Sequence, residues 1–468
     1  MSPTGAATLA GAFGGAAPIL IAGLNRLSTV NNVGDVASIY RQKSTNYAFF
    51  THNVLNITDN LSITGGLRYT HEKKEFSAAF DNNNTACGAQ QAFFSPFLPG
   101  GAAAFPAALQ GFTQALVNLT CQGNATSALN ALSLADERTE SQFSGTAVVS
   151  YKVTPRLLTY ASYSKGYKAG GFNLDRSALG LPIYAPTDPR NTTNAGLRFG
   201  TANLAFDPEK VDAYEVGFKF NSHQFTLNVA GFRQEFKNFQ LNTFNGSVFL
   251  VQTVNGCKDD LGIGDNDSDP TTGRCATKRV KPGVVSQGVE VEAAIYPVRN
   301  IAVTAGFTYA DVKYAKNLVG DRTGAPLDPA LFLLPGSQLS NAPKYVVTSS
   351  FAFTPDIGSN GLSALFYVDS RLSSDYNTGS DLFPEKIQDG FITVNARIGI
   401  RGKDERWSVE LWSQNLFNKN YEQVAFSAPF QGSSSIANTR AFGTTANQLF
   451  GAFLAEPRTF GVTARTRF

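Results

Sequence analysis

The connections between the strands that this sequence predicts alternate between short turns and long loops along the whole chain. The short turns lie at 58–60, 154–156, 222–224, 297–300, 355–360 and 402–405, and the long loops lie at about 76–137, 170–208, 316–343, 376–388 and 418–456. This alternation places every short turn at one end of an antiparallel sheet. Transmembrane β-barrels have short turns on one side of the membrane and longer loops on the other, unlike soluble sandwiches. We therefore predict an all-β, antiparallel transmembrane β-barrel.

The segments between these connections alternate apolar and polar residues. Ile392, Val394 and Ile398 alternate with Thr393 and Asn395, and the stretches 61–70 and 459–468 follow the same rule. A period of two gives a sheet with one apolar face and one polar face. A tilted strand of about ten residues crosses a bilayer, and we expect every strand here to reach that length.

A sheet in hydrocarbon must close on itself, because every backbone polar group needs a partner there. The polar face then lines a wet lumen. We expect the residues that face this lumen to include Arg68, Glu215, Lys219, Arg397 and Arg401. Aromatic residues near strand ends predict interfacial girdles. The aromatic set comprises Tyr47, Phe49, Phe50, Tyr69, Tyr160, Tyr163, Phe218, Phe220, Trp407 and Trp412.

Composition agrees with a membrane location. Only 16% of the 468 residues are charged, whereas aromatic residues make up 12%, and soluble domains average about 25% charged residues. The charged run 136–140 and many like it exclude a bundle of transmembrane helices. The net charge of +3 comes from scattered residues and does not indicate nucleic-acid binding.

The N-terminal segment is apolar but lacks the features of a signal peptide. Gly5 to Leu24 carries no charge, yet no Lys or Arg precedes it, and a signal peptide normally has a basic region before its apolar core. We therefore expect residues 1–43 to form an extracellular loop or an irregular N-terminal segment, and residues 44–468 to form the barrel.

The strand count predicts part of a larger barrel. About thirteen strands result if 248–296 is one strand interrupted by the insertion 257–275. Single-chain bacterial barrels have even counts, and the first strand here, 44–57, descends from an outer loop. We expect the front of the barrel to be missing, so that the isolated chain has two unpaired edges.

The four cysteines form two local pairs inside irregular insertions. Cys87 precedes Cys121, and Cys257 precedes Cys275, without the C-x-x-C spacing of a zinc or redox site. Paired cysteines in such loops suit an oxidising compartment. We expect two loop-closing disulfides.

Residues that could carry chemistry are sparse. His52, His71 and His223 are far apart, and the motifs of hydrolases, zinc proteases and nucleotide-binding proteins are absent from the sequence. We therefore expect a protein that is not an enzyme and has no cofactor. Asp265, Asp267 and Asp269 have a spacing that calcium favours. Because Pro270 and Ala276 replace the Gly and Glu of an EF-hand, a solvated acidic loop is the alternative, and the sequence leaves the two open.

Six segments, in this order, resemble strands of the TonB-dependent outer-membrane receptor family. They are Leu61–Thr70 (LSITGGLRYT), Tyr160–Asn173 (YASYSKGYKAGGFN), Pro208–Gly217 (PEKVDAYEVG), Gly288–Glu292 (GVEVE), Trp412–Tyr421 (WSQNLFNKNY) and Glu456–Phe468. The resemblance covers about residues 40–468. It implies the last thirteen strands of a plugged barrel of about 22 strands, with the plug, TonB box and signal peptide absent from this sequence.

The resemblance also implies a function and partners. It implies uptake of a scarce nutrient, with a ferric siderophore as our choice, across the outer membrane of a Gram-negative bacterium. Energy is then expected from the TonB–ExbB–ExbD complex, and folding from the barrel-assembly machinery, for which Phe468 is the expected C-terminal signal. Two alternatives stay open: a plugless passive pore or inactive fragment, and a soluble all-β binding protein.

Overall fold

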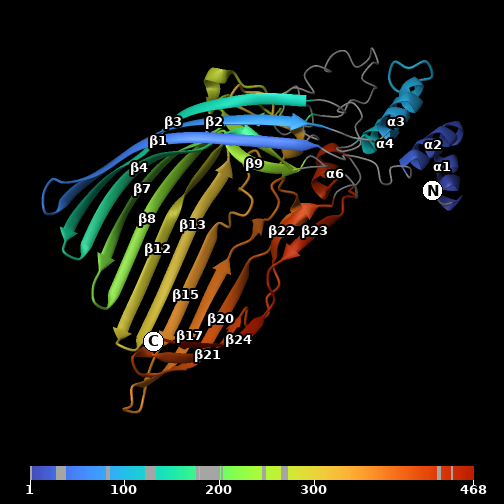
Figure 1. Cartoon of the computed structure of the whole chain (residues 1–468). Helices are drawn as coiled ribbons and strands as arrows, with labels where there is room; N and C mark the ends of the chain where they lie inside the picture. The colour runs from blue at the N-terminus through green and yellow to red at the C-terminus, as the bar shows by residue number, and fades with distance from the viewer. Residues whose placement is uncertain are drawn as a thin grey trace.

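The structure is a computed structural model in which one broad, curved antiparallel sheet dominates (Figure 1). It describes residues 3–27, 38–80, 85–121, 133–174, 179, 201, 204–244, 249–264, 272–428, 434–443 and 446–467. Within these residues thirteen strands pair in sequence order, and β16 (Asp356–Ile357) adds a short pair to β17. The thirteen are β1 (Ile39–Asn56), β2 (Leu61–Ala79), β3 (Ser133–Thr154), β4 (Leu157–Lys168), β7 (Glu209–Asn221), β8 (Phe225–Lys237), β12 (Val284–Val298), β13 (Ile301–Tyr314), β15 (Tyr345–Phe353), β17 (Leu362–Ser373), β20 (Phe391–Arg401), β21 (Trp407–Gln414) and β24 (Thr459–Thr466).

The short turns gather at one end of the sheet and the long connections at the other, as predicted (Figure 1). The first turn shows why so few residues are enough. The Thr58 hydroxyl accepts hydrogen bonds from the backbone N–H groups of Asn60 and Leu61, at 3.2 and 3.0 Å. A threonine side chain that satisfies the turn in this way reverses the chain within one short segment.

The sheet does not close within the described residues. β1 pairs only with β2, and β24 pairs only with β21. Each end of the sheet therefore presents an edge whose backbone groups are available to another strand. The expected thirteen antiparallel strands are confirmed, and the sheet forms a barrel wall rather than a closed barrel.

The predicted strand 248–296 is wrong. β8 continues in the sheet directly to β12, which begins at Val284. The intervening residues form β9 (Phe239–Phe244), β10 (Phe249–Cys257) and β11 (Val280–Lys281), which pair with one another and with β14 (Leu318–Val319) in a separate sheet. Its β-branched and aromatic residues match those of a membrane strand, so composition could not separate the two.

Three strands are shorter than the ten residues that we expected. β15 has nine residues, and β21 and β24 have eight each. β21 ends where Asn415 adopts a left-handed φ of 48°. The Asn415 side-chain amide donates hydrogen bonds to the carbonyls of Lys419 and Glu456, at 2.9 and 3.2 Å, so the chain leaves the sheet at this residue.

The N-terminal segment, expected to be irregular or a loop, contains helices. α1 (Pro3–Phe13) and α2 (Ala17–Leu27) are joined by a 3-10 turn, η1 (Gly14–Ala16), and β1 begins at Ile39 rather than at residue 44. Among the described residues, Gly5–Leu27 is the one helical stretch that is long and apolar enough to cross a membrane by length and composition.

These helices pack against two more helices from the β2–β3 loop (Figure 1). The partners are α3 (Ala86–Phe94) and α4 (Ala107–Thr120), linked through η2 (Ser95–Phe97). Leu20, Phe94 and Val117 are fully buried at their contact, and Cys87 is bonded to Cys121 across a sequence separation of 34. We call this unit the helical cluster.

The other loop elements lie at the long-loop end of the sheet. They are β5 (Gly171–Phe172), β6 (Ala205–Phe206), η8 (Thr277–Arg279), η9 (Pro329–Leu331), β18 (Tyr376–Asn377), η10 (Pro384–Lys386), β19 (Ile387–Gln388), β22 (Glu422–Ser427), α6 (Ile436–Phe442) and β23 (Phe450–Leu454). A further 3-10 turn, η11 (Lys403–Glu405), lies at the other end. Leu241, Val254, Leu318 and Leu334 meet in a buried apolar core beneath the loops, so the loops are folded structures.

Candidate functional site

The strand register places the five predicted lumen residues on one face of the sheet. Directly paired residues of antiparallel strands point to the same side, and successive residues of a strand alternate. The pairs from β1 to β24 show that five residues lie on the same face of the sheet: Arg68, Glu215, Lys219, Arg397 and Arg401. We call this the polar face.

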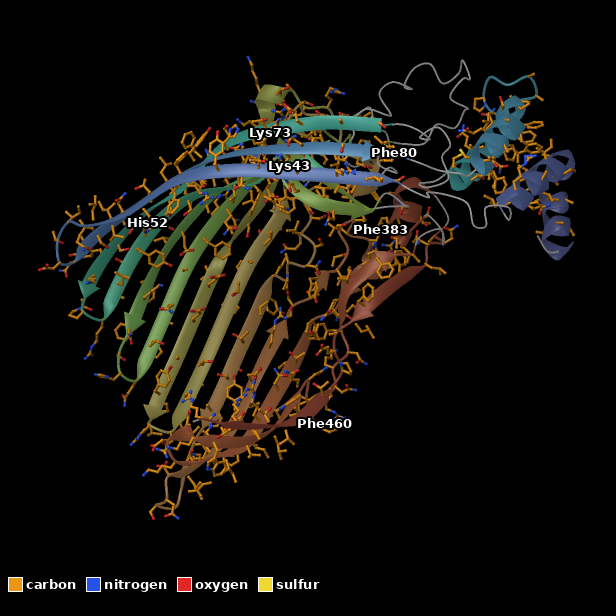
Figure 2. All side chains as sticks on the ribbon, viewed as in Figure 1. Lys43, His52, Lys73, Phe80, Phe383 and Phe460 are labelled. Atoms are coloured by element: carbon orange, nitrogen blue, oxygen red, sulfur yellow. A yellow bond between two sulfur atoms is a disulfide. The ribbon has the colours of Figure 1, made fainter. Side chains whose placement is uncertain are left out.

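The opposite face is apolar and exposed. Phe460 of β24 is 81% exposed (labelled in Figure 2), and Phe49 of β1 is 71% exposed. Large apolar side chains exposed along a whole sheet face are uncommon in soluble proteins and mark a surface that meets a partner or lipid. The apolar face therefore has the character of a lipid-facing barrel wall.

The aromatic set divides between the two faces. Phe50 pairs with Arg68, Tyr160 with Gly217 and Trp412 with Arg397, so these three rings lie on the polar face. The other seven lie on the apolar face, where a girdle is expected. Tyr160 illustrates the difference, because its hydroxyl donates a hydrogen bond to Glu215 at 2.6 Å.

A cavity of about 1050 Å³ lies among the outer loops. Its wall comes from the outer end of β3, the loop before β7, strand β10 and the loop after β14. The polar lining includes Arg138, Asp207, Gln252, Arg322 and Asp328. This volume is in the range of small-molecule binding sites, and we call it the outer-loop cavity.

Asp207 joins three of these wall segments. It accepts a hydrogen bond from Arg138 at 2.7 Å and forms an ion pair with Arg322 at 2.8 Å, and Arg138 also pairs with Glu140. Gln252 donates to Asp328 at 2.7 Å from a fourth segment. Charge-assisted bonds of this kind fix the positions of the loops that carry them. The cavity is therefore held open by polar contacts between segments distant in the sequence.

A buried cation fixes two further loops. Lys386 is 2% exposed, and its ammonium donates to Asp381 at 2.6 Å and to the Ser427 hydroxyl at 3.1 Å. Phe383, labelled in Figure 2, and Phe450 lie within 5.6 Å of the same ammonium. A buried charge needs such partners, so Lys386 holds the 374–390 loop against the β22–β23 hairpin.

Burial raises the pKa of Tyr376 in the same 374–390 loop. Its hydroxyl donates a long hydrogen bond, 3.4 Å, to the carbonyl of Glu422. This contact links the same two loops as Lys386.

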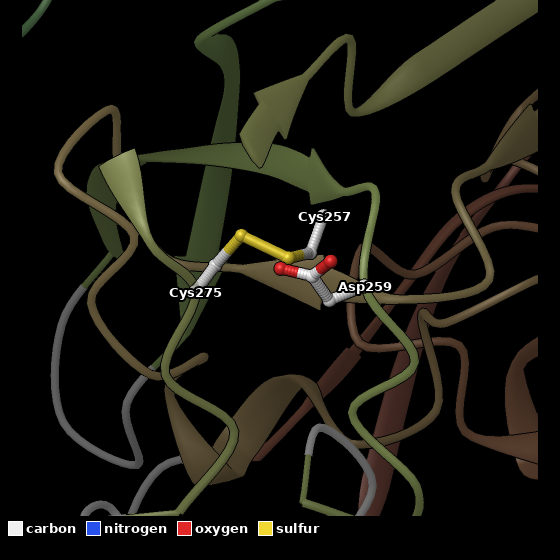
Figure 3. A group of neighbouring side chains, drawn as sticks. All are labelled: Cys257, Asp259 and Cys275. Atoms are coloured by element: carbon white, nitrogen blue, oxygen red, sulfur yellow. A yellow bond between two sulfur atoms is a disulfide. The ribbon is translucent and has the colours of Figure 1, made fainter. Parts of the chain in front are cut away.

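Cys257, Asp259 and Cys275 come together in the outer loops (Figure 3). The two sulfur atoms are bonded to each other, so they offer no thiolate to a metal. Asp259 instead accepts a hydrogen bond from Arg279 at 2.8 Å. This trio is thus a closed disulfide beside an ion pair.

Several predicted residues do not join a site. Asp265, Asp267, Asp269 and Phe468 lie outside the described residues. His71 stacks on Tyr47 at 4.9 Å and hydrogen-bonds Ser141 at 2.9 Å on the apolar side.

The other two histidines also lie apart. His52 is an exposed residue of β1, nearer the short-turn end (Figure 2), and His223 lies in a short turn. Within the described chain the three histidines therefore share no centre.

The two-faced sheet with short turns at one end and folded loops at the other defines the class as a transmembrane β-barrel. The family model described as "TonB dependent receptor-like, beta-barrel" matches residues 8–416. The chain belongs to this family. Its proteins are outer-membrane transport receptors of Gram-negative bacteria rather than enzymes.

Solved structures show the same fold. The ferric yersiniabactin uptake receptor FyuA from Yersinia pestis is 15% identical, with a TM-score of 0.57, over 92% of this chain and 47% of that one. The ferric-catecholate import receptor Fiu from E. coli K12, in its closed form, is 16% identical, with a TM-score of 0.53, over 92% and 45%.

A third structure, the siderophore receptor PiuA from Acinetobacter baumannii, is 16% identical, with a TM-score of 0.53, over 91% and 43%. The chain therefore spans less than half the length of these relatives. At these identities the likeness concerns the fold.

Proposed function

We propose that this chain forms part of the wall and the outer loops of a TonB-dependent receptor that imports a ferric siderophore or a similar iron complex. The observation that carries the proposal is the outer-loop cavity, which lies at the long-loop end of a sheet with one polar face. Such a cavity can collect a ligand from outside the cell, and a polar lumen can pass it inward. The relatives named above are described as receptors for ferric siderophores.

The remaining parts of the proposal follow the family. Energy comes from the TonB–ExbB–ExbD complex, acting through the part of the receptor that corresponds to the relatives' length not spanned here. The barrel-assembly machinery inserts the protein, with Phe468 as its C-terminal signal, and the Cys87–Cys121 and Cys257–Cys275 disulfides close two of its outer loops.

Iron uptake tests the proposal. Deleting the gene should abolish uptake of radioactive iron supplied as the cognate ferric siderophore, and deleting tonB should do the same. Asp207→Ala should reduce uptake about tenfold or more at unchanged surface abundance, since it leaves Arg138 and Arg322 without their shared carboxylate. Thr139→Ala on the opposite face of β3 is the matched control.

Two results contradict this function. Unchanged iron uptake in the deletion strain refutes the iron substrate, and a copper-uptake assay is then informative, because the copper transporter OprC shares this fold with a TM-score of 0.51. High ion conductance of the purified receptor in planar bilayers refutes the gated receptor in favour of the passive pore.

A further inference from the structure

Arginines follow the polar face along its C-terminal strands. Arg371 lies on β17, Arg397 and Arg401 lie on β20, and Arg465 lies on β24. The register sets Arg371 opposite Thr393, Arg397 opposite Tyr367 and Arg401 opposite Ser408, which pairs with Arg465. Arg371, Arg397 and Arg401 thus occupy levels four residues apart, roughly 13 Å along the strands, and Arg465 lies level with Arg401. We call this row the basic wall.

The acidic residues of the basic wall neutralise only part of it. Glu410 is 5% exposed and lies 3.7 Å from Arg401 and 3.3 Å from Arg465. Asp369 accepts a hydrogen bond from the Asn395 amide at 2.8 Å. Among the described residues no carboxylate lies within ion-pairing distance of Arg371 or Arg397, and both side chains are exposed in this part of the chain.

A small cavity adjoins one of these exposed cations. It has a volume of about 230 Å³ and is lined by Arg397, Glu410, Trp412, Thr463 and Arg465, among others. Arg397 itself lies 5.6 Å from the Tyr367 ring, and Trp412 donates its indole N–H to Thr463 at 3.0 Å. The aromatic groups thus hold the cavity wall, while Arg397 remains exposed to what enters.

Strands β7 and β12 carry the opposite charge on the same face. Glu215, Glu290 and Glu292 lie there with Lys219 as the one cation of these two strands on this face. We call this the acidic wall. Between the two walls, β13 and β15 present Thr304, Thr308 and Ser350 to the polar face. The lumen surface is therefore electrically asymmetric.

We propose that the basic wall is a guiding surface for anions, which carries a negatively charged chelate of the polycarboxylate or catecholate class from the outer loops toward the short-turn end. This inference rests on the proposed function and specifies the charge of its cargo. A channel wall of one sign raises the local concentration of counter-ions. The acidic wall repels the same cargo and keeps it on the arginine side.

Thiol labelling in the intact receptor measures the local potential of each wall. The four native cysteines are disulfide-bonded, so one introduced cysteine is the reactive thiol of this chain. Thr393→Cys places it opposite Arg371, and Ala230→Cys places it opposite Glu290. The probes are a sulfonate-bearing and a trimethylammonium-bearing methanethiosulfonate, with rates normalised to those of a free thiol.

We expect the anionic reagent to react several-fold faster than the cationic one at residue 393, and the order to reverse at residue 230. Arg371→Gln together with Arg397→Gln should bring the ratio at residue 393 close to one and leave residue 230 unchanged. Glu290→Gln should bring the ratio at residue 230 close to one and leave the ratio at residue 393 unchanged. Heat-modifiable migration on gels checks that each variant has folded.

Equal ratios of anionic to cationic labelling at the two positions overturn the proposal. A ratio at residue 393 that both arginine substitutions leave unchanged also overturns it. Failure of the anionic reagent to reach residue 393 also overturns it, because no anion then travels along this wall. Labelling requires no transport. Charge-dependent labelling without iron uptake therefore supports the basic wall and refutes the iron function. Iron uptake without charge-dependent labelling supports the iron function and refutes the basic wall.

Discussion

Neighbouring residues of β13 lie in opposite environments. Phe307 is in the middle of the strand on the apolar face, where it pairs with Val291 and Val347. Thr308, the next residue, lies on the polar face opposite Glu290. The face of the sheet on which a residue lies therefore determines which substitutions that residue can accept.

Arginine at these two positions should therefore have different effects. Phe307→Arg is expected to destabilise the folded receptor by about 2–4 kcal/mol, since it puts a charge into lipid near the membrane midplane. Thr308→Arg should be nearly neutral because the lumen is wet. Urea unfolding in lipid vesicles measures both, and equal losses would mean that the two faces are assigned wrongly.

Lys386 offers a test of the outer loops at the scale of a single residue. Lys386→Met leaves the Asp381 carboxylate buried without its cation, which costs roughly 3–5 kcal/mol of local stability. We expect external protease to cut within 374–390 in cells that carry this variant. Lys419→Met, in the loop after β21, is the matched control, and protection that survives Lys386→Met would contradict the structural role.

Two disulfide bonds support the elements at the long-loop end of the sheet. The Cys257–Cys275 disulfide joins the end of β10 to the segment before η8, and the Cys275 backbone N–H donates a hydrogen bond to the Gly324 carbonyl at 2.9 Å. It therefore supports β10 and the loop after β14, which both line the outer-loop cavity. The Cys87–Cys121 disulfide supports the helical cluster instead.

Removing each disulfide should separate these two roles. Chain-entropy estimates give about 3–4 kcal/mol for loops of these lengths. Cys257→Ser with Cys275→Ser should lower iron uptake severalfold, whereas Cys87→Ser with Cys121→Ser should expose the helical cluster to protease and leave uptake close to normal. Thiol titration of the native receptor should find no reactive thiol from this chain before reduction and four afterwards. An equal loss of uptake in both pairs would contradict the division.

The elements also show what the sequence could predict. The thirteen strands were predictable because the period of two and the alternating turn lengths are local signals, and Arg68 and Arg397 followed from the same parity. The helices α1 and α2 were missed because their Ala- and Gly-rich sequence has little polar periodicity. The cavity was missed because Arg138, Asp207, Gln252 and Arg322 lie on two strands and two loops that are distant in the sequence and meet only in the folded chain.

The main sheet has two free edges within the described residues. β1 and β24 each have one neighbour in the described chain, and a membrane cannot satisfy the backbone groups of an open edge. The 468 residues expressed alone should therefore fail to give a compact form that resists detergent and shifts on heating. Semi-native gel electrophoresis after refolding into lipid vesicles tests this, and a heat-modifiable band would show that the two edges can meet.

The alternation of the two faces also limits how such a gene can change in length. Losing one codon in the middle of β20 would turn Arg397 and Arg401 toward the lipid and Ile398 and Ile400 toward the water for the rest of that strand. Losing two codons would shorten the strand but keep each side chain on its own side. Strands of this kind therefore have a parity that evolution must preserve, so that odd changes in length are confined to the turns and loops.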